Sequence, residues 1–423
     1  MGLELTAERD RLMEILALAG GIIVKQEDSL FSRVLLKKED GALRLEAGNV
    51  ELFHQATLLG EDVESTEGEV AILYKDFMSV VNSMPKGKVK VLEQGKEVRG
   101  KPVLTVKGPK RIKFNLVYQP EKKPALGFPS FDSVQTFGDF SVDFLRTLLE
   151  ILSPVTQKGK EDYKRFGVRV ERVDGGRHLR MVLTDGHRLI LVDGDASAPE
   201  EDPLTDGIIF PPSFVTQLQR ICQVLPPDET LGLFLGREGG QKFFVIEYKA
   251  EGLCYFTACL ENEASAFPEY KSISFSQVGR YHVLDCRGLQ EAVGRLTPLT
   301  NVGDLTFVPE EDGGYVAVQG VRSRALFSRE EVEMERTLGA QRGTYSLVEL
   351  EEAEQLRMGV DLGYFADALK TLHTPKVALG MTSPLEPLFV IPYVDAAANL
   401  PGFVQNHIHV IMPVRADWNQ EEP

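Results

Sequence analysis

Cysteines are few in this chain, and long apolar runs are absent. None of the four cysteines belongs to a Cys-x-x-Cys pair, which argues against a structural zinc site and indicates a reducing compartment. The longest apolar stretch, residues 16–24, is far shorter than the ~20 residues that a helix needs to span a membrane. The first residues, MGLELTAERDRL, are acidic and amphipathic, unlike a secretory signal. We therefore expect a cytoplasmic protein.

Several motifs of enzymes and metal proteins are also missing. No Gly-Lys pair is followed by Ser or Thr, so the chain has no phosphate-binding P-loop. No Ser stands two residues before a Gly, which excludes a hydrolase nucleophile elbow. His407 and His409 would share one side of a strand, but no carboxylate or cysteine cluster accompanies them as metal ligands. We interpret them as part of a polar strand face and expect neither a metal nor a cofactor.

Residues 184–191, TDGHRLIL, are the one segment that resembles catalytic equipment. A histidine beside a carboxylate is common in acid–base catalysis, and Asp185 and His187 stand two residues apart. The same letters also fit a structural role, since Asp-Gly is typical of a turn and the aliphatic residues after it predict a buried strand. Because no nucleophile or cofactor site accompanies the pair, we favour the turn and keep a hydrolase as the lesser alternative.

Charge is negative overall but unevenly spread. Acidic residues outnumber basic ones by 63 to 47, for a formal net charge of −16, and an acidic surface repels nucleic-acid phosphates. Basic stretches lie at 86–90, 107–113 and 157–165, and acidic ones at 199–203, 330–336 and 349–354. Composition leaves two alternatives open: a solvated mixed surface, or one basic face on an otherwise acidic protein.

Three segments carry the same helix signature. Each places aliphatic residues at helical spacing behind a residue type that often caps a helix N-terminus. The expected caps are Thr6, Ser141 and Asp285, which lie 135 and 144 residues apart. A recurrence at this distance indicates repeated units of domain size rather than a solenoid repeat.

Two further signatures share this period. In each unit a second helix ends at a proline and an alternating strand follows; the prolines are Pro85, Pro226 and Pro375. The related stretches FPSFDS (128–133) and FPEYKS (267–272) join successive units. We therefore predict three similar domains, at residues 1–135, 136–277 and 278–423.

Alternating apolar and polar residues, broken by Gly-containing turns, fill much of each unit. The clearest stretches are residues 33–58, 166–193 and 305–328, which read as successive hairpins. The predicted fold class is α+β, with three similar domains that each pack two helices on antiparallel sheets.

Three stretches of the chain resemble the signatures of one protein family. TDGHRL (184–189), FPEYKSI (267–273) and VIMPVR (410–415) match in order and spacing the bacterial DNA polymerase III beta subunits, the sliding clamps. The threefold internal repeat matches too, and the resemblance covers essentially the whole chain. It implies DNA-clamp domains that two copies of the chain close head-to-tail into a homodimeric ring.

The resemblance implies a function without catalysis. A clamp encircles duplex DNA and tethers the replicative polymerase, which confers processivity on DNA replication. Its helices would present basic residues to the DNA, and contacts to phosphate alone bind without sequence specificity and weaken with salt. We would then expect the protein at the nucleoid. The matching DNA-contact positions are Lys25, Lys75, Lys158, Lys160, Tyr163 and Lys164.

The family also binds short peptides of polymerase, clamp loader and repair proteins between its second and third domains. Apolar residues, with an adaptable Met among them, suit such a cleft. We expect His187 and Arg188 at its rim and Leu189 toward the cleft. The matching pocket residues are Thr184, Gly186, His187, Arg188, Leu189, Pro268, Ile273, Tyr364, Val410, Ile411, Met412, Pro413 and Arg415.

Ring closure is expected to pair an edge strand near residues 113–117 with the third domain. The expected interface residues are Phe114, Leu116, Pro298 and Leu299. Two alternatives to the clamp stay open. One is a protein-binding scaffold that never encircles DNA, and the lesser one is the hydrolase that uses Asp185 and His187.

Overall fold

The computed structural model describes residues 3–39, 41–59, 68–158, 167–200, 202–204, 207–261, 267–273, 280–310, 313–320, 329–335, 341–342, 345–346, 356–394 and 404–414. The chain forms two compact units. Unit 1 comprises residues 1–146, 198–206 and 210–264, and unit 2 comprises residues 147–197, 207–209 and 265–423. Among the described helices, none is both long and apolar enough to cross a membrane.

The helices form where the repeated signatures predict them. Those within the described residues are α1 (Arg9–Ala19), α2 (Tyr74–Ser83), α3 (Val142–Lys158), α5 (Pro212–Val224), α6 (Cys286–Leu296) and α7 (Leu362–Lys370). The aliphatic stripes that define the first signature are buried, as in Leu12 and Ile15 of α1 and Leu289 and Val293 of α6. Each side chain of this size contributes roughly 1.5–3 kcal/mol when fully buried, so these stripes hold the helices to the sheets.

Two of the three expected helix caps are confirmed. The Ser141 hydroxyl accepts the backbone N–H of Phe144 at 3.2 Å, and the Asp285 carboxylate caps α6 by accepting the N–H of Gly288. The expectation for Thr6 is wrong. Thr6 lies inside a strand, opposite Lys90, and α1 begins only at Arg9. The residues expected to begin the helix are instead hydrogen-bonded in this strand pair.

Unit 1 contains two antiparallel sheets. The larger sheet has the order β5 (Gly68–Leu73), β2 (Arg33–Glu39), β3 (Ala42–Gly48), β4 (Leu52–Leu58), β16 (Leu253–Leu260), β15 (Gln241–Ala250), β14 (Thr230–Glu238) and β9 (Ser133–Ser141). The smaller has the order β1 (Glu4–Glu8), β6 (Lys88–Val98), β7 (Lys101–Lys107) and β8 (Lys113–Val117). β8 is thus an edge strand, as expected for the segment near residues 113–117.

Unit 2 contains one long sheet. Its order is β13 (Ile208–Phe210), β10 (Val168–Val173), β11 (His178–Thr184), β12 (Arg188–Asp195), β26 (Val404–Ile411), β25 (Leu388–Tyr393), β24 (Lys376–Met381), β17 (Arg280–Asp285), β20 (Arg329–Glu335), β19 (Gly313–Gly320), β18 (Val302–Glu310) and β23 (Leu356–Asp361). A separate hairpin joins β21 (Gln341–Arg342) and β22 (Tyr345–Ser346). The predicted α+β class with antiparallel sheets is confirmed.

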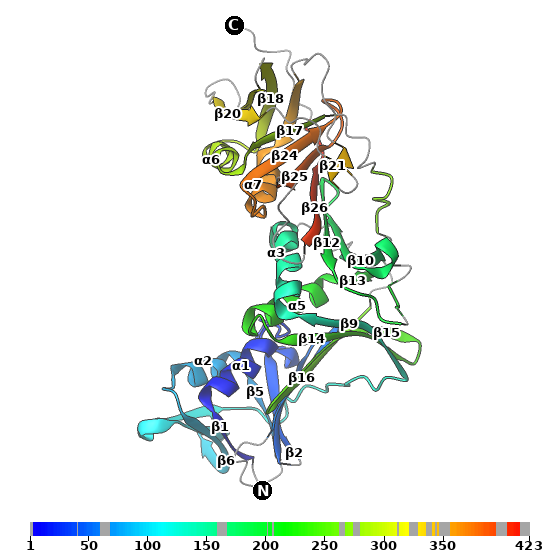
Figure 1. The fold of residues 1–423 in the computed structure, drawn as a ribbon. Coiled ribbons are helices and arrows are strands. Elements are labelled where there is room, and N and C mark those ends of the chain that lie inside the picture. The colour runs from blue at the N-terminus through cyan, green and yellow to red at the C-terminus, as the bar shows by residue number, and fades with distance from the viewer. Residues whose placement is uncertain are drawn as a thin grey trace. The chain divides into compact units, whose positions relative to one another are not determined.

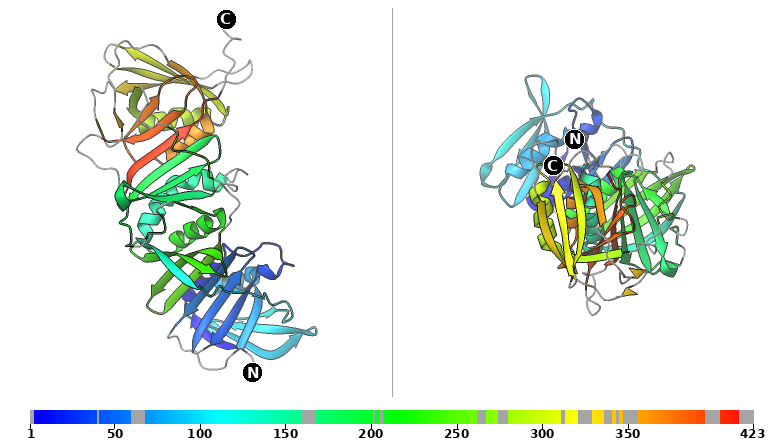
Figure 2. Two further views of the ribbon diagram at one scale, coloured as in Figure 1. Left: turned by 90° about the vertical axis from the view of Figure 1, so that its right-hand side faces the viewer. Right: turned by 90° about the horizontal axis from the view of Figure 1, so that it is seen from above.

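Paired strands cross both boundaries between the predicted domains. Within unit 1, β4 of the first predicted domain pairs with β16 of the second. Within unit 2, β12 of the second pairs with β26 of the third, and Figure 1 shows the red β26 beside the green β12. The left view of Figure 2 again places the red strand along green strands of the same sheet. The two units therefore differ from the three predicted domains, whose limits remain a prediction.

Candidate functional site

The TDGHRLIL segment forms a tight turn followed by a buried strand. Gly186 adopts a φ of +85°, a left-handed conformation that favours glycine. One oxygen of Asp185, Oδ1, accepts the backbone N–H groups of His187 and Arg188, both at 3.1 Å. The Thr184 hydroxyl accepts the N–H of Gly186 at 3.0 Å and donates to the carbonyl of Arg188 at 2.7 Å. The predicted turn is confirmed, and two short side chains hold its backbone.

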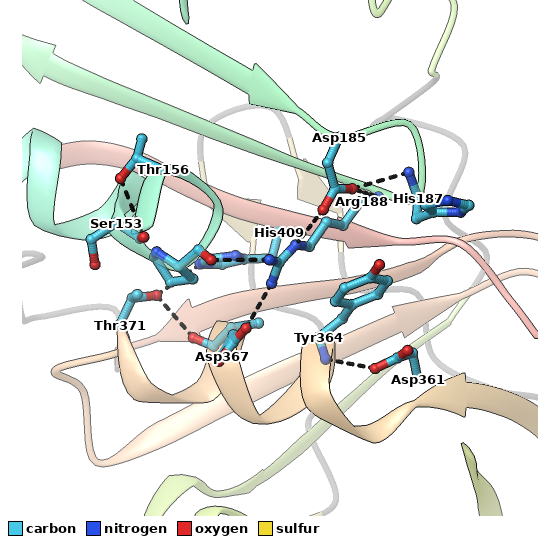
Figure 3. Close-up of polar contacts among 12 residues, drawn as sticks. Ser153, Thr156, Asp185, His187, Arg188, Asp361, Tyr364, Asp367, Thr371 and His409 are labelled. Atoms are coloured by element: carbon cyan, nitrogen blue, oxygen red, sulfur yellow. Dashed lines mark hydrogen bonds and ion pairs between the residues drawn. The ribbon is translucent and has the colours of Figure 1, made fainter. Parts of the chain in front are cut away.

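Arg188 lies at the centre of a buried polar network, which Figure 3 shows. Its Nε contacts Asp185 Oδ2 at 3.1 Å, and its Nη1 contacts Asp367 Oδ2 at 2.9 Å. Its Nη2 donates to the backbone carbonyl of Pro154 in α3 at 3.0 Å. Arg188 is 5% exposed, so the expected position at a rim is wrong. A guanidinium can be buried only with opposite charge and acceptors around it, and both carboxylates and the carbonyl supply these.

These contacts weigh against acid–base catalysis at the turn. Asp185 directs one oxygen to two backbone N–H groups and the other to Arg188. His187 instead places its ring against Tyr364, with a centroid distance of 6.3 Å and an interplanar angle of 21°. The Asp185 carboxylate thus stabilises the turn, and the His187 ring faces an aromatic ring of α7.

Tyr364 connects the turn to the first turn of α7. The guanidinium carbon of Arg188 lies 4.4 Å from the centroid of the Tyr364 ring, a distance at which cation and ring attract. The Tyr364 N–H donates at 3.0 Å to Asp361, the residue that caps α7. The tyrosine is therefore positioned from two sides, by the helix cap and by the buried arginine.

The last strand places the residues of VIMPVR on different faces. In the β12–β26 ladder, Leu189 stands opposite Val410, and both belong to one apolar cluster. Ile411 belongs to a second cluster, built on α6 and α7, because successive side chains of a strand point to opposite faces. Met412 donates its N–H to the carbonyl of His187 at 2.9 Å and leaves 46% of its surface exposed. Pro413, the next residue, is partly exposed.

The segment FPEYKSI packs on the Leu189–Val410 cluster. Ile273 is partly buried against it and Pro268 is exposed. Tyr270 is buried in the cluster, and its hydroxyl donates to Glu171 of β10. Burial raises the pKa of the Glu171 carboxyl, but Tyr270, Arg169 and Lys271 outweigh burial and hold the pKa below its usual value. One buried carboxylate thus anchors the segment to the sheet.

The residues expected to contact DNA are only partly described. Lys25 and Lys75 are exposed and line a cleft of about 480 Å³ in unit 1. Lys75 pairs there with Glu27 at 3.1 Å. Lys158 ends α3, but its side chain lies outside the described part of the chain. Lys160, Tyr163 and Lys164, like the pocket residue Arg415, also lie outside it.

The residues expected at a ring interface expose apolar surface. Phe114 on the edge strand β8 is 36% exposed, and Leu116 of the same strand is partly buried. Leu299 is 43% exposed and Pro298 is exposed as well, just after α6. Exposed apolar residues on an edge strand are unusual, because such an edge readily pairs with another chain.

His407 and His409 face the same side of β26, and both are buried. Their Nε2 atoms lie 2.8 Å apart, and the Nε2 of His409 lies 2.8 Å from the Thr371 hydroxyl. Burial lowers the pKa of His407 to about 3, so the ring is neutral. The face is polar as predicted, but neighbouring side chains rather than solvent satisfy it. Among the described residues, no group of three or more His, Cys, Asp or Glu side chains is arranged to hold a metal ion.

Sequence reasoning missed three participants in this region: Pro154, Glu171 and Asp367. Asp367 offers the clearest signal, because it follows Tyr364 by three residues, which places both on one face of α7, and it is buried. An acid among buried residues of an amphipathic helix needs a cationic partner. Its partner, Arg188, is 179 positions away in the chain.

Comparisons with known proteins find relatives of full length. No protein-family model matches the chain. A Beta sliding clamp of Pseudomonas aeruginosa is 25% identical over 378 residues, which cover 88% of this chain and 91% of that protein. A Beta sliding clamp of Vibrio cholerae is 24% identical and covers 98% and 100%. The crystal structure of the DNA polymerase III subunit beta from Pseudomonas aeruginosa superposes with a TM-score of 0.73 at 21% identity, over 98% of this chain and 100% of that one. These matches confirm the resemblance read from the sequence: the chain is a homologue of the bacterial beta sliding clamps and has their fold.

Proposed function

We propose that this protein is a sliding clamp, a non-catalytic accessory subunit of DNA polymerase III. Two copies close into a ring around duplex DNA and tether the replicative polymerase and other DNA-processing proteins. The observation that carries the proposal is the alignment with beta sliding clamps over nearly the whole chain. The protein would act in the cytoplasm, at the nucleoid.

The partner site is the face of the β12–β26 strand pair that carries Leu189 and Val410. Leu189, Val410 and Ile273 supply an apolar floor, and Met412 stands exposed beside the turn. A flexible thioether adapts to ligands of different shape, which suits a site that several proteins share. Short peptides of the polymerase, clamp loader and repair proteins would bind here through aliphatic or aromatic side chains.

DNA contact would come from basic residues on or beside the helices. Lys25 and Lys75 are exposed in unit 1. The segment at the end of α3 would add Lys158, Lys160, Tyr163 and Lys164. The net charge of −16 opposes tight binding to DNA, but a closed ring is retained by topology rather than by affinity. Contacts to phosphate alone would let it slide along any sequence.

Closure would use the exposed apolar edge of β8. Phe114 and Leu116 of one protomer would meet Pro298 and Leu299 of its partner. A head-to-tail contact that closes on itself makes a ring, and pairing removes the exposed edge.

Loading on circular DNA tests the proposal. In the presence of a clamp loader and ATP, the protein should remain on nicked circular DNA during gel filtration and leave once the circle is cut. Retention that survives linearisation would indicate ordinary binding rather than encirclement. No retention on either form, together with intact partner binding, would favour the protein-binding scaffold.

Oligomeric state offers an independent check. Size-exclusion chromatography with light scattering should give the mass of a dimer, and a stable monomer at micromolar concentration would contradict the ring. The hydrolase alternative predicts a turnover of esters or phosphoesters that His187→Ala abolishes. The structure weakens it, because the Asp185 carboxylate is bound to backbone N–H groups and to Arg188.

A further inference from the structure

The chain contains two strand junctions with the same backbone pattern. In unit 2, Asp185 Oδ1 accepts the N–H groups of the second and third residues after it. In unit 1, Asn49 Oδ1 accepts the N–H groups of Glu51 and Leu52 in the same way, both at 2.9 Å. The two turns therefore have one design, and each leads into a central strand of its sheet.

The strand that pairs with each turn is matched as well. In unit 2, Arg188 stands opposite Ile411, and the N–H of Met412 donates to the carbonyl of His187 at 2.9 Å. In unit 1, Leu52 stands opposite Cys259, and the N–H of Leu260 donates to the carbonyl of Glu51 at 2.9 Å. Position by position, Leu52 thus corresponds to Arg188.

The side chains that connect the helices differ between the two units. In unit 1, a neutral side chain of α5 joins two helices directly, because Gln217 Nε2 donates to the Leu18 carbonyl of α1 at 2.9 Å. In unit 2, Asp367 of α7 contacts Arg188, and Arg188 donates to the Pro154 carbonyl of α3. Unit 1 also joins α5 to α1 through a charged side chain, because Arg220 Nε donates to the Ala17 carbonyl. The difference is that this arginine belongs to the helix, whereas Arg188 belongs to the turn.

The fold itself does not require this charged insertion. Taking a guanidinium and carboxylates out of water costs several kcal/mol per ion, and well-packed neutral groups often stabilise as much. In unit 1 the neutral residues Leu52 and Gln217 are both buried, although Gln217 Oε1 has no hydrogen-bond partner among the described residues. What Arg188 adds in unit 2 is a connection from the helices to the turn and to the ring of Tyr364.

We propose that Asp367 is a positioning residue for the partner-peptide site, acting through Arg188. The inference rests on the proposed function. Asp367 holds the buried guanidinium beneath the turn, and the guanidinium holds Tyr364 on one side and the Asp185 carboxylate on the other. The backbone of His187, which binds that of Met412, is thereby fixed relative to α7.

The arrangement also bears on which peptides bind. With its side chain 4% exposed, Arg188 offers no free positive charge to a ligand, and its three donor nitrogens are engaged. Acidic residues of a partner peptide would therefore not be read by this arginine. Its contribution to affinity is geometric, through the turn and Tyr364.

A variant that gives unit 2 the neutral residues of unit 1 separates positioning from folding. The triple substitution Asp185→Asn, Arg188→Leu and Asp367→Gln does so, because Asn49 stands at the place of Asp185, and its Oδ1 can still accept the two backbone N–H groups. We expect this variant to form dimers and to unfold within a few degrees of the wild type, but to bind peptide roughly tenfold more weakly. The probe is a short fluorescein-labelled peptide with a Leu-Phe pair between polar residues, followed by anisotropy at two salt concentrations.

Three companion variants complete the test. Asp367→Asn should also weaken the peptide about tenfold, and Asp367→Glu should recover part of that loss. The matched control Gln217→Ala, at the other junction, should lower thermal stability and leave peptide affinity within about twofold. Wild-type affinity in the triple variant would overturn the proposal, as would equal losses in Gln217→Ala. Failure of the wild-type protein to bind the peptide or to dimerise would count against the proposed function instead.

Discussion

Two linker segments of related sequence, FPSFDS (128–133) in unit 1 and FPEYKS (267–272) in unit 2, cover equivalent strand pairs and do so with different chemistry. Phe131 of the first lies among aromatic rings, 5.7 Å from the centroid of Phe243 and 5.9 Å from that of Phe256. Tyr270 of the second packs among both aliphatic and aromatic residues, with the centroid of the Phe267 ring 6.3 Å from its own, and its hydroxyl donates to Glu171. Both faces therefore contain rings, and the second adds one polar anchor.

The strand residues beside the two linkers also differ, in how far their side chains are exposed. Leu260 of unit 1 is partly buried against the phenylalanine cluster. Met412, which makes the matching backbone contact in unit 2, is 46% exposed. The backbone contacts are therefore shared, and whether a ligand can bind depends on the side chains around them. Variants that exchange side chains between the two places test this comparison.

The largest effect is expected from Arg188→Ala. Loss of the guanidinium removes a cationic partner from two buried carboxylates, Asp185 and Asp367, which should cost about 3–5 kcal/mol in unit 2. The melting transition of that unit should fall steeply in calorimetry, and peptide binding should be lost with it. A change below about 1 kcal/mol would mean that water already screens the network.

Tyr270→Phe gives unit 2 the ring that unit 1 has at the equivalent place. Removing a hydroxyl that donates to a carboxylate should cost roughly 1.5–3 kcal/mol. Phe131→Tyr in unit 1 is the matched control and should not create a comparable gain. Thermal unfolding of both variants at neutral pH provides the measurement.

The same tyrosine predicts a pH dependence. The pKa of Glu171 is held below its usual value in the folded chain, so its stabilising contribution is present above the unfolded pKa and is lost as pH falls through the folded one. The stability gap between wild type and Tyr270→Phe should therefore narrow on acidification below about pH 4. A gap that is constant down to about pH 2 would show that the carboxylate is not the partner that matters.

Met412→Ala should weaken peptide binding by roughly 1–2 kcal/mol, as for an interface anchor. Dimer formation should be unchanged in light scattering, because the residue is not among those expected at the ring interface. Leu260→Ala, at the matching place in unit 1, should leave peptide affinity unaltered. Equal losses from the two variants would contradict the assignment of the site to unit 2.

The smallest effect is expected from Lys75→Ala, outside both junctions. Stability and peptide affinity should stay within about 0.5 kcal/mol of wild type, since Lys75 is a surface charge. Binding to short duplex DNA should weaken, and the slope of log affinity against log salt should shrink by about 1. Glu27→Gln, which releases Lys75 from its ion pair, should shift DNA affinity the opposite way.

Local patterns predicted most of the fold because they act over a few residues. Helical stripes, proline stops and the Asp185-Gly186 turn depend on neighbours in the chain, and the structure follows them. Thr6 failed as a cap because its strand pairs with residues more than 80 positions later. A contact across that distance leaves no mark on the local pattern.

The candidate site was harder to predict, because its geometry depends on distant partners. The resemblance pointed to Arg188 and Tyr364, but neither the burial of Arg188 nor the role of Asp367 follows from the letters TDGHRL. Strand register likewise separates Val410 from Ile411, which a linear motif treats as one group. The sequence could predict which residues belong to the site, but not how their side chains are oriented.

The strand ladder between β12 and β26 has a practical consequence for cutting the molecule into parts. Its paired residues run from Arg188 opposite Ile411 to Gly194 opposite Val404, so a chain that ends at residue 277 would leave β12 without its neighbour. A chain that begins at residue 278 would likewise leave β26 without its partner β12. Each fragment would carry a long unpaired edge in the middle of a former sheet, and such edges recruit other strands. Fragments cut at the repeat boundary should therefore aggregate, even though the boundary looks like a natural place to divide the sequence.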